Sequence, residues 1–300
     1  MMPSKSITET QQLSDETYTV LSNLTCGTGL YLLHLKSCTQ TRLQFLPGQF
    51  VMLDLPETQF AFRRPFSILD CPKPDEIRIY YKAVGFGTKK MVAFQPGEMI
   101  RCLGPLGNTF PAMQSNHPAS EKALYVAGGI GIAPMIFQAS FYKDTTGLCI
   151  YGVRSHSEIG LDALLASNFK DRLYITTDDG SAGTTGNVCT VLEKSPDIID
   201  GITVVYVCGP TPMMKAVCKQ IAAFNPNLPV YVSLEEHMPC GTGACSGCVV
   251  QLNTDPLPVK TCQFGPIFLA STINWQGIAP TSMPEKPNAC NPHETVISND

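Results

Sequence analysis

MPCGTGACSGCVV, at residues 238–250, and VKTCQFG, at residues 259–265, contain four cysteines at a distinctive spacing. The first three cysteines follow the pattern C-x4-C-x2-C, and thirteen residues separate the third from the fourth. Plant-type ferredoxins hold a [2Fe-2S] cluster with cysteines at this kind of spacing. The segment therefore predicts such a cluster. Its metal ligands would be Cys240, Cys245, Cys248 and Cys262.

The residues between these cysteines suit a loop that curls tightly around a cluster. They are small, and they include Gly241, Gly243, Ala244, Ser246 and Gly247. Glycine readily takes positive φ, and backbone N–H groups in such a loop can point at the sulfurs. A structural zinc site is the alternative, although zinc knuckles usually join two close cysteine pairs rather than leave a four-residue gap. The other nine cysteines show no such grouping and are expected to be buried apolar side chains.

Length and composition indicate two folded modules with appendages, because 300 residues exceed one ordinary core. The formal net charge is −4 at pH 7, and no basic stripe suggests a nucleic acid partner. No apolar run is long enough for a membrane helix, and the N-terminus lacks the apolar core of a signal peptide. We therefore expect a cytoplasmic protein whose cysteines stay reduced, rather than a secreted disulfide scaffold.

The order of the sequence patterns predicts a multi-domain β plus α/β protein. Short β-like runs between Gly and Pro turns favour an antiparallel β-barrel at residues 16–112. Apolar strands that alternate with helix-compatible segments favour a parallel α/β domain at residues 120–230. The cysteine-rich module covers residues 231–278. The polar ends, at residues 1–15 and 279–300, are expected to be disordered tails.

Two motifs in the predicted barrel suit a flavin. Arg64-Pro65-Phe66-Ser67 offers a cation for a phosphate, and an aromatic ring and a hydroxyl for the isoalloxazine. Tyr80-Tyr81-Lys82 follows, and then a glycine turn in which Gly87 and Thr88 can present N–H groups and a hydroxyl to a pyrophosphate. Each motif is weak by itself, because an arginine at a strand end is usually only solvated.

Two strand ends in the predicted α/β domain suit a dinucleotide. Gly128, Gly129 and Gly131 directly follow the strand-like ALYVA, where glycines allow a nucleotide to approach the backbone and a helix N-terminus. The pattern is not the full G-x-G-x-x-G, so a tight turn that binds nothing is the alternative. Cys208-Gly209 ends a second strand. Because ligands of open α/β sheets sit at the carboxyl ends of strands, both turns are expected to face one crevice.

The succession RPFS, GFGT, GPLGN, GGIGIAP, CGP and CGTGACSGC resembles the ferredoxin reductase superfamily. Within it, the four cysteines and the segment Ser233–Met238 resemble the electron-transfer subunits of B-type dihydroorotate dehydrogenases, over about Tyr18 to Ile278. The resemblance implies FAD on the barrel, NAD on the α/β domain and the [2Fe-2S] cluster on the last module. Lys82 and His237 depart from the family pattern, which has an arginine and a longer basic residue there.

The residue roles implied by the resemblance match those read from the motifs. FAD would be carried by Arg64, Pro65, Phe66, Ser67, Tyr80, Tyr81, Lys82, Gly87 and Thr88. The nicotinamide nucleotide would face Gly128, Gly129, Gly131, Cys208 and Gly209. No catalytic side chain is expected, because hydride transfer from a nicotinamide needs no acid or base; Asp178 and Asp179 are expected to shape the crevice.

The resemblance implies an oxidoreductase subunit in which FAD converts a hydride into single electrons. No segment looks like a dihydroorotate pocket, so the partner would be an FMN-containing catalytic subunit, in a heterotetramer that serves pyrimidine biosynthesis. A related subunit of a bifurcating NAD(P)H–ferredoxin reductase or of a sulfide dehydrogenase is the first alternative. An iron–sulfur redox sensor is the second. No arginine cluster suits a 2′-phosphate, which favours NAD over NADP.

Overall fold

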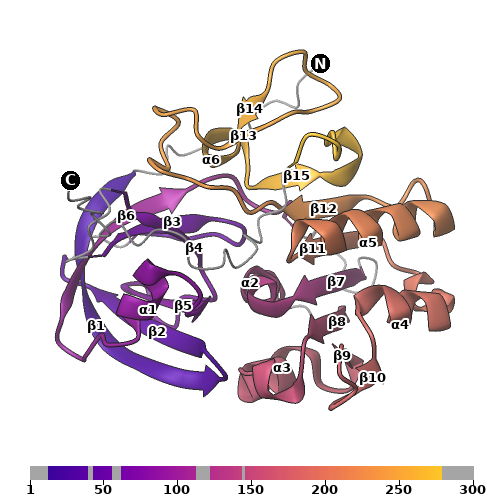
Figure 1. Ribbon diagram of the computed structural model, residues 1–300, viewed down its shortest axis with the longest axis horizontal. Coiled ribbons are helices and arrows are strands. Elements are labelled where there is room, and N and C mark those ends of the chain that lie inside the picture. The colour runs from indigo at the N-terminus through magenta and orange to yellow at the C-terminus, as the bar shows by residue number, and fades with distance from the viewer. Residues whose placement is uncertain (1–12, 40–42, 56–61, 113–121, 144–145, 279–300) are drawn as a thin grey trace, which may run out of the picture.

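The computed structural model describes residues 13–39, 43–55, 62–112, 122–143 and 146–278. They form a β-barrel, an α/β domain and a small cysteine-rich module that contacts both (Figure 1). The expected tails lie outside the described residues, apart from residues 13–15, where the first strand begins at Ser14.

The barrel is a six-stranded antiparallel sheet with the strand order β4-β3-β6-β1-β2-β5. Its strands are β1 (Ser14–Gly27), β2 (Leu30–Ser37), β3 (Phe50–Asp54), β4 (Arg64–Ser67), β5 (Glu76–Lys82) and β6 (Met99–Leu106). A bridge between Asp70, just after β4, and Arg78 of β5 joins the two ends of the sheet, so the sheet closes on itself. The fold thus has the predicted antiparallel barrel.

The barrel closes around alternating apolar side chains, as a period of two residues requires. Leu33 and Leu35 of β2 face Ile77 and Ile79 of β5 in one buried cluster, and each is at most 1% exposed. The short helix α1 (Phe86–Met91) adds Met91 to that cluster. This packing leaves the ends of β4 and β5 at the side of the barrel that meets the α/β domain.

The α/β domain has the sheet order β10-β9-β8-β7-β11-β12-β15, parallel except for β15. Its strands are β7 (Ala123–Gly128), β8 (Leu148–Val153), β9 (Leu173–Thr177), β10 (Thr184–Thr185), β11 (Val204–Cys208), β12 (Val230–Ser233) and β15 (Ile267–Leu269). Its helices are α2 (Ile132–Phe141), α3 (Asp162–Phe169), α4 (Val188–Lys194) and α5 (Thr211–Phe224). The alternation of strands and helices predicted from the sequence is present.

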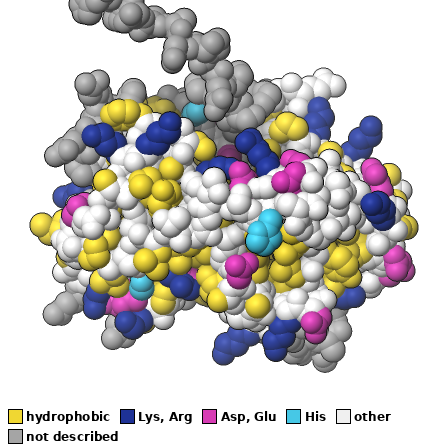
Figure 2. Space-filling model, turned by 60° about the horizontal axis from the view of Figure 1, so that its bottom comes forward, with side chains coloured by type: hydrophobic (Ala, Val, Ile, Leu, Met, Phe, Trp, Pro, Cys, Tyr) yellow, Lys and Arg dark blue, Asp and Glu magenta, His cyan; other side chains and the backbone are white. Residues whose placement is uncertain are grey.

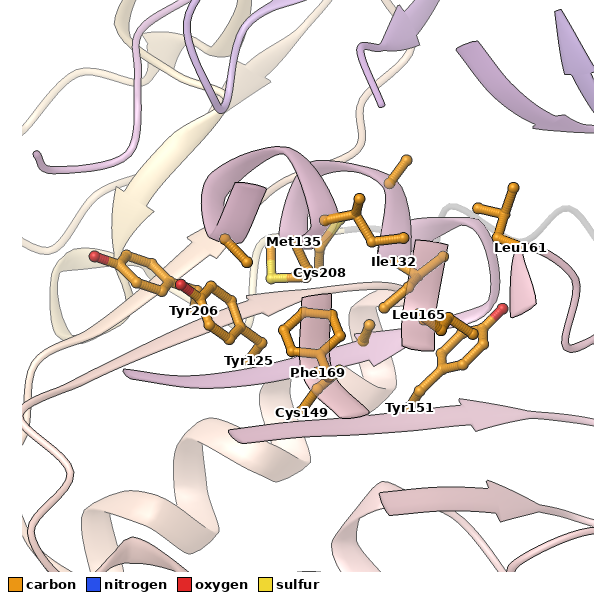
Figure 3. Packing of buried hydrophobic residues seen from close by; sticks show 14 of the residues in the cluster. Tyr125, Ile132, Met135, Cys149, Tyr151, Leu161, Leu165, Phe169, Tyr206 and Cys208 are labelled. Carbon is orange, nitrogen blue, oxygen red and sulfur yellow. The ribbon is translucent and has the colours of Figure 1, made fainter. Parts of the chain in front are cut away.

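Helices cover both faces of this sheet, which explains why its strands are apolar on both sides. On one face, Tyr125 and Tyr206 pack with Phe169 of α3 and with α2 (Figure 3). On the other face, Val126 and Val207 pack against α4 and α5. Both faces of the sheet are therefore buried, and only the ends of its strands remain accessible to a ligand.

The strand order places the candidate nucleotide site. From β7 the chain adds β8 and β9 on one side of the sheet and later adds β11 and β12 on the other. The carboxyl ends of β7 and β11 are consequently neighbours at the point where the order reverses, which is where ligands of such sheets bind.

The last module consists of β13 (Val249–Val250), β14 (Val259–Lys260), α6 (Thr261–Phe264) and strand β15. Asn108, just after β6, fastens it to the barrel. The Asn108 Nδ2 donates to the carbonyl oxygens of Phe264 (2.9 Å) and Ile267 (2.8 Å), and the Ile267 N–H donates to Asn108 Oδ1 (2.9 Å). Gly107 (φ +78°) permits the approach, because a Cβ there would lie 2.7 Å from Pro266 Cδ.

Candidate cofactor sites

The four cysteines of the predicted cluster site meet as two contacting pairs. Cys245 is close enough to Cys240, and Cys248 to Cys262, for each pair to affect the protonation of its thiols. In the described part of the chain, no three His, Cys, Asp or Glu side chains are arranged to hold a single metal ion. A [2Fe-2S] cluster instead takes four cysteines over two irons, so a donor set of two thiol pairs fits it.

Hydrogen bonds to the Cys240 sulfur favour its thiolate. Burial by itself would raise the pKa, but N–H and side-chain donors on Cys245 and Thr242 lower the pKa of Cys240 to about 6. At Cys262, burial and the neighbouring Cys248 and Cys240 sulfurs raise the pKa to about 12. Because metal ligands are thiolates, Cys262 must release its proton when the cluster binds.

Two glycines of the cluster loop are required by its geometry. Gly241 (φ +71°) lies where a Cβ would be 2.7 Å from Met52 Cγ of the barrel. Gly243 (φ +82°) lies where a Cβ would be 2.1 Å from Gln263 Cδ on α6. The loop is therefore wedged between the barrel and the helix that carries Cys262, a cradle that only glycine permits.

A cavity of about 350 Å³ lies where the barrel, the α/β domain and the cysteine-rich module meet. Pro65, Phe66, Ser67 and Thr88 line it from the barrel, as do Tyr80, Tyr81 and Lys82; Gly131 and Cys208 line it from the α/β domain. The volume is within the usual range for organic ligands. Most residues expected to carry FAD therefore share one cavity, and its walls suit a flat aromatic ligand with a polar tail.

Two of the residues expected at the flavin lie outside the lining of this cavity. The Arg64 guanidinium folds back to donate to the carbonyl oxygens of Phe62 and Arg63. Gly87 lies against Leu55, where a Cβ would be 3.0 Å from Leu55 Cδ1. The position of Arg64 in its strand is as expected, but its side chain does not point into the cavity.

The aromatic residues of β5 support the cavity from beneath. Tyr81 is 1% exposed, stacks on Tyr31 with ring centres 5.4 Å apart, and meets the Phe66 ring edge-on. The Tyr81 hydroxyl donates to Asn23 Oδ1 (3.2 Å). These contacts fix Phe66 and Tyr81 before any ligand arrives, so the site is largely pre-organised.

A second cavity of about 330 Å³ adjoins the first and contains the remaining predicted nucleotide residues. Gly128, Gly129 and Gly209 line it, together with Asp178. Lys82 lines both cavities, and its Nζ lies 2.7 Å from Glu158 Oε1 across the boundary between the barrel and the α/β domain. The two cavities thus meet at the carboxyl ends of β7 and β11, the edge expected to bind NAD.

Glycine is needed at these positions of the edge for two different structural reasons. A Cβ on Gly131 would lie 2.4 Å from the Cys208 carbonyl oxygen, and a Cβ on Gly128 would lie 2.5 Å from Met213 Sδ. Both allow two turns to pack closely. Gly129 (φ +55°) has no atom within 4 Å of the Cβ position, so its open side faces the second cavity. Gly129 is therefore the glycine best placed for close approach of a nucleotide.

The sequence analysis missed one wall of the first cavity. Residues Leu234 to Met238 line it, and Glu235 lines both cavities. The Glu235 side chain is exposed toward the two cavities, and desolvation by the surrounding protein atoms raises the pKa of its carboxyl. The sheet order is the feature that places this wall in the cavity, because Ser233 ends β12 at the same edge of the sheet at which Cys208 ends β11.

Comparison with known proteins decides the family. The iron-sulfur cluster binding domain of dihydroorotate dehydrogenase B matches residues 235–274, and an oxidoreductase NAD-binding domain matches residues 125–219. The dihydroorotate dehydrogenase B (NAD(+)) electron transfer subunit of Bacillus caldolyticus is 36% identical over 236 residues, covering 76% of this chain and 86% of the relative. The chain belongs to this family of electron transfer subunits.

A second member of the family and one solved structure of another oxidoreductase are also similar to this chain. The dihydroorotate dehydrogenase B electron transfer subunit of Streptococcus mutans is 34% identical over 267 residues, covering 86% of this chain and 97% of the relative. A structure of an NADH-dependent reduced ferredoxin-NADP oxidoreductase, described for flavin-based electron bifurcation, is 26% identical with a TM-score of 0.71, covering 86% of this chain and 90% of that one. The predicted fold class, oxidoreductase role and cofactor set of [2Fe-2S], FAD and NAD(H) are confirmed.

The surface of this dihydroorotate dehydrogenase B family member carries mixed charge. On the face shown in Figure 2, basic and acidic side chains are interspersed. None of the helices in the described part of the chain has the length and apolar character needed to span a bilayer.

Proposed function

We propose that this chain carries electrons between NAD(H) and an FMN-containing subunit that oxidises dihydroorotate in pyrimidine biosynthesis. The relatives' name, electron transfer subunit of dihydroorotate dehydrogenase B, supports such a partner. One observation carries the proposal: Phe50 and Met238 line the first cavity and belong to the same buried cluster as Cys248 and Cys262. The flavin-sized cavity and the cluster loop are thus joined by a short, dry apolar contact.

Each side of the cleft has a separate binding task in this proposal. The barrel residues that line the first cavity, Phe66 and Ser67 among them, would hold FAD. The turns at Gly129 and Gly209 hold NAD, and the four cysteines hold the cluster. When bound, the flavin exchanges a hydride with the nicotinamide and single electrons with the cluster, which relays them.

The chain's own residues position these groups and keep water out of the path between them. Cys208 is 2% exposed, and burial raises the pKa of its thiol far above the usual range, so it is a neutral wall rather than a nucleophile. Phe50 and Met238 exclude water between the cavity and the cluster loop. No side chain has to act as an acid or base toward the nicotinamide.

The partner subunit docks near the cluster in this proposal, within a heterotetramer. Cys245 is exposed, whereas Cys248 and Cys262 are 1% and 3% exposed, so the cluster loop has one open edge. The same module exposes the apolar side chains of Leu257 and Phe264. We place the assembly in the cytoplasm, because all twelve cysteines in the described ranges are free thiols and a cluster needs them reduced.

The test is to co-express the chain with the FMN-containing dihydroorotate dehydrogenase subunit and to follow NAD reduction by dihydroorotate. Cys245→Ser should abolish NAD reduction, because the cluster loses one thiolate, and should leave flavin reduction by NADH in place. Cys38→Ser, which changes another exposed cysteine, on the barrel, is the matched control and should retain full activity. A wild-type complex that reduces ferredoxin but never couples dihydroorotate to NAD would contradict the proposed partner.

A further inference from the structure

Lys260 is the sole lysine or arginine in a long stretch of sequence around the cluster. No other lysine or arginine occurs between Lys219 and Lys286, whereas the same stretch contains four carboxylates. These are Glu235, Glu236, Asp255 and Glu285. The permanent positive charge of the cysteine-rich module is therefore concentrated in one side chain.

The structure directs this charge at the cluster loop. Lys260 ends β14, two residues before Cys262, and pairs with Val249, the neighbour of Cys248. Its Nζ donates to the Gly243 carbonyl oxygen at 2.6 Å, in the turn between Cys240 and Cys245. Lys260 thus lies two residues from one cysteine of the site and is hydrogen-bonded to the turn between two others.

In the part of the chain that the structure describes, no Asp or Glu forms an ion pair with the Lys260 ammonium, although lysines elsewhere do, such as Lys73 with Glu76 and Lys82 with Glu158. The side chain is half-buried, so water screens its charge less than at a fully exposed site. Its field therefore acts mainly on the loop to which it is bonded.

We propose that Lys260 sets the reduction potential of the [2Fe-2S] cluster by stabilising its reduced form, an inference that rests on the proposed cluster ligands. Reduction adds one electron and therefore one negative charge to a centre already surrounded by four thiolates, with no bond broken and no proton moved. Net charge, hydrogen bonds and exposure are the protein's levers on such potentials. A nearby ammonium favours the extra electron, so Lys260 makes the cluster a better acceptor from the flavin.

The effect is expected to be moderate because the ammonium is only partly buried. We expect its removal to weaken cluster reduction by about tenfold, which for a one-electron couple is a shift of about 59 mV to lower potential. Added salt should narrow the difference between wild type and the neutral variants, since screening weakens a partly exposed charge.

The experiment is an anaerobic potentiometric titration of the full-length, FAD-loaded protein, read by the electron paramagnetic resonance signal of the reduced cluster. Lys260→Met removes the charge and the donor, Lys260→Gln removes the charge but keeps a donor for the Gly243 carbonyl, and Lys260→Arg keeps both. The Met and Gln variants should titrate at lower potential, and the Arg variant should stay near wild type. Lys194→Met, on α4, is the control and should not shift the potential.

Several results would overturn the proposal. Cluster-loaded Met and Gln variants that titrate at the wild-type potential would show that the charge is not felt. An Arg variant that shifts as far as the Met variant would assign the effect to loop shape. Loss of iron and sulfide from both neutral variants, with retention in the Arg variant, would assign Lys260 to cluster assembly instead. A wild-type protein without iron and sulfide would refute the cluster itself, which is a distinct failure of the proposed function.

Discussion

The clamp at Asn108 predicts a mutant that separates flavin chemistry from cluster chemistry. Asn108→Ala removes three side-chain hydrogen bonds, to Phe264 and Ile267, but leaves the backbone bond from Asn108 N–H to the Gly265 carbonyl oxygen (2.7 Å). Ile267 is 4% exposed, so its freed N–H loses a partner without gaining water. The loss is about 2–4 kcal/mol, or roughly 30- to 700-fold in the population with a loosened module.

Hydrogen exchange measured by mass spectrometry should detect this loosening in β15 and α6, with unchanged protection in β2 and β5 of the barrel. In stopped-flow experiments, bleaching of the flavin by NADH should keep its rate, whereas reduction of the cluster should slow. Asn168→Ala is the control, because its Nδ2 makes a local bond to the Leu164 carbonyl oxygen within α3 (2.8 Å), far from the module. Wild-type exchange in β15 of Asn108→Ala would refute the clamp.

Further outcomes follow from the cleft. Gly131→Ala should reduce the free energy of unfolding by about 1–3 kcal/mol, because the added Cβ meets the Cys208 carbonyl oxygen. A lower thermal unfolding midpoint would show this loss. Gly129→Ala should reduce the free energy of unfolding by about 1–2 kcal/mol because of the positive φ at this position, and its main effect should be a higher KM for NADH. Equal KM values in the two variants would contradict the assignment of Gly129 to nucleotide binding and of Gly131 to packing. The raised pKa of Glu235 means that its contribution to stability is present below its usual pKa of about 4.5 and is lost as pH rises through the raised value. Urea unfolding of the apoprotein should therefore show Glu235→Gln gaining stability over wild type as pH rises through that window, and a pH-independent difference would contradict it.

Local motifs predicted much of the fold and of the site. The short β-like runs expected within residues 16–112 are present as the strands of the barrel, because alternation and turn residues are local signals. Cysteine spacing is equally local, and the four cysteines meet as two pairs. Predicted nucleotide residues at Gly129 and Gly209 line the second cavity.

Features that depend on distant segments were not predictable in the same way. The Asn108 clamp joins residues more than 150 positions apart, and nothing near GPLGN indicates its partners. The wall at Leu234 to Met238 follows from the position of β12 in the sheet order. Arg64 shows the limit at the level of one side chain: its strand is as expected, but its guanidinium turns to nearby carbonyls rather than to the cavity.

The central claim is an electron path from NAD(H) through FAD to the cluster within this one chain. It is tested most directly by an anaerobic visible spectrum of the purified protein before and after addition of NADH. The account predicts flavin and iron–sulfur bands that both bleach. A colourless, zinc-containing protein, or a flavin that bleaches while the cluster bands persist, would contradict it.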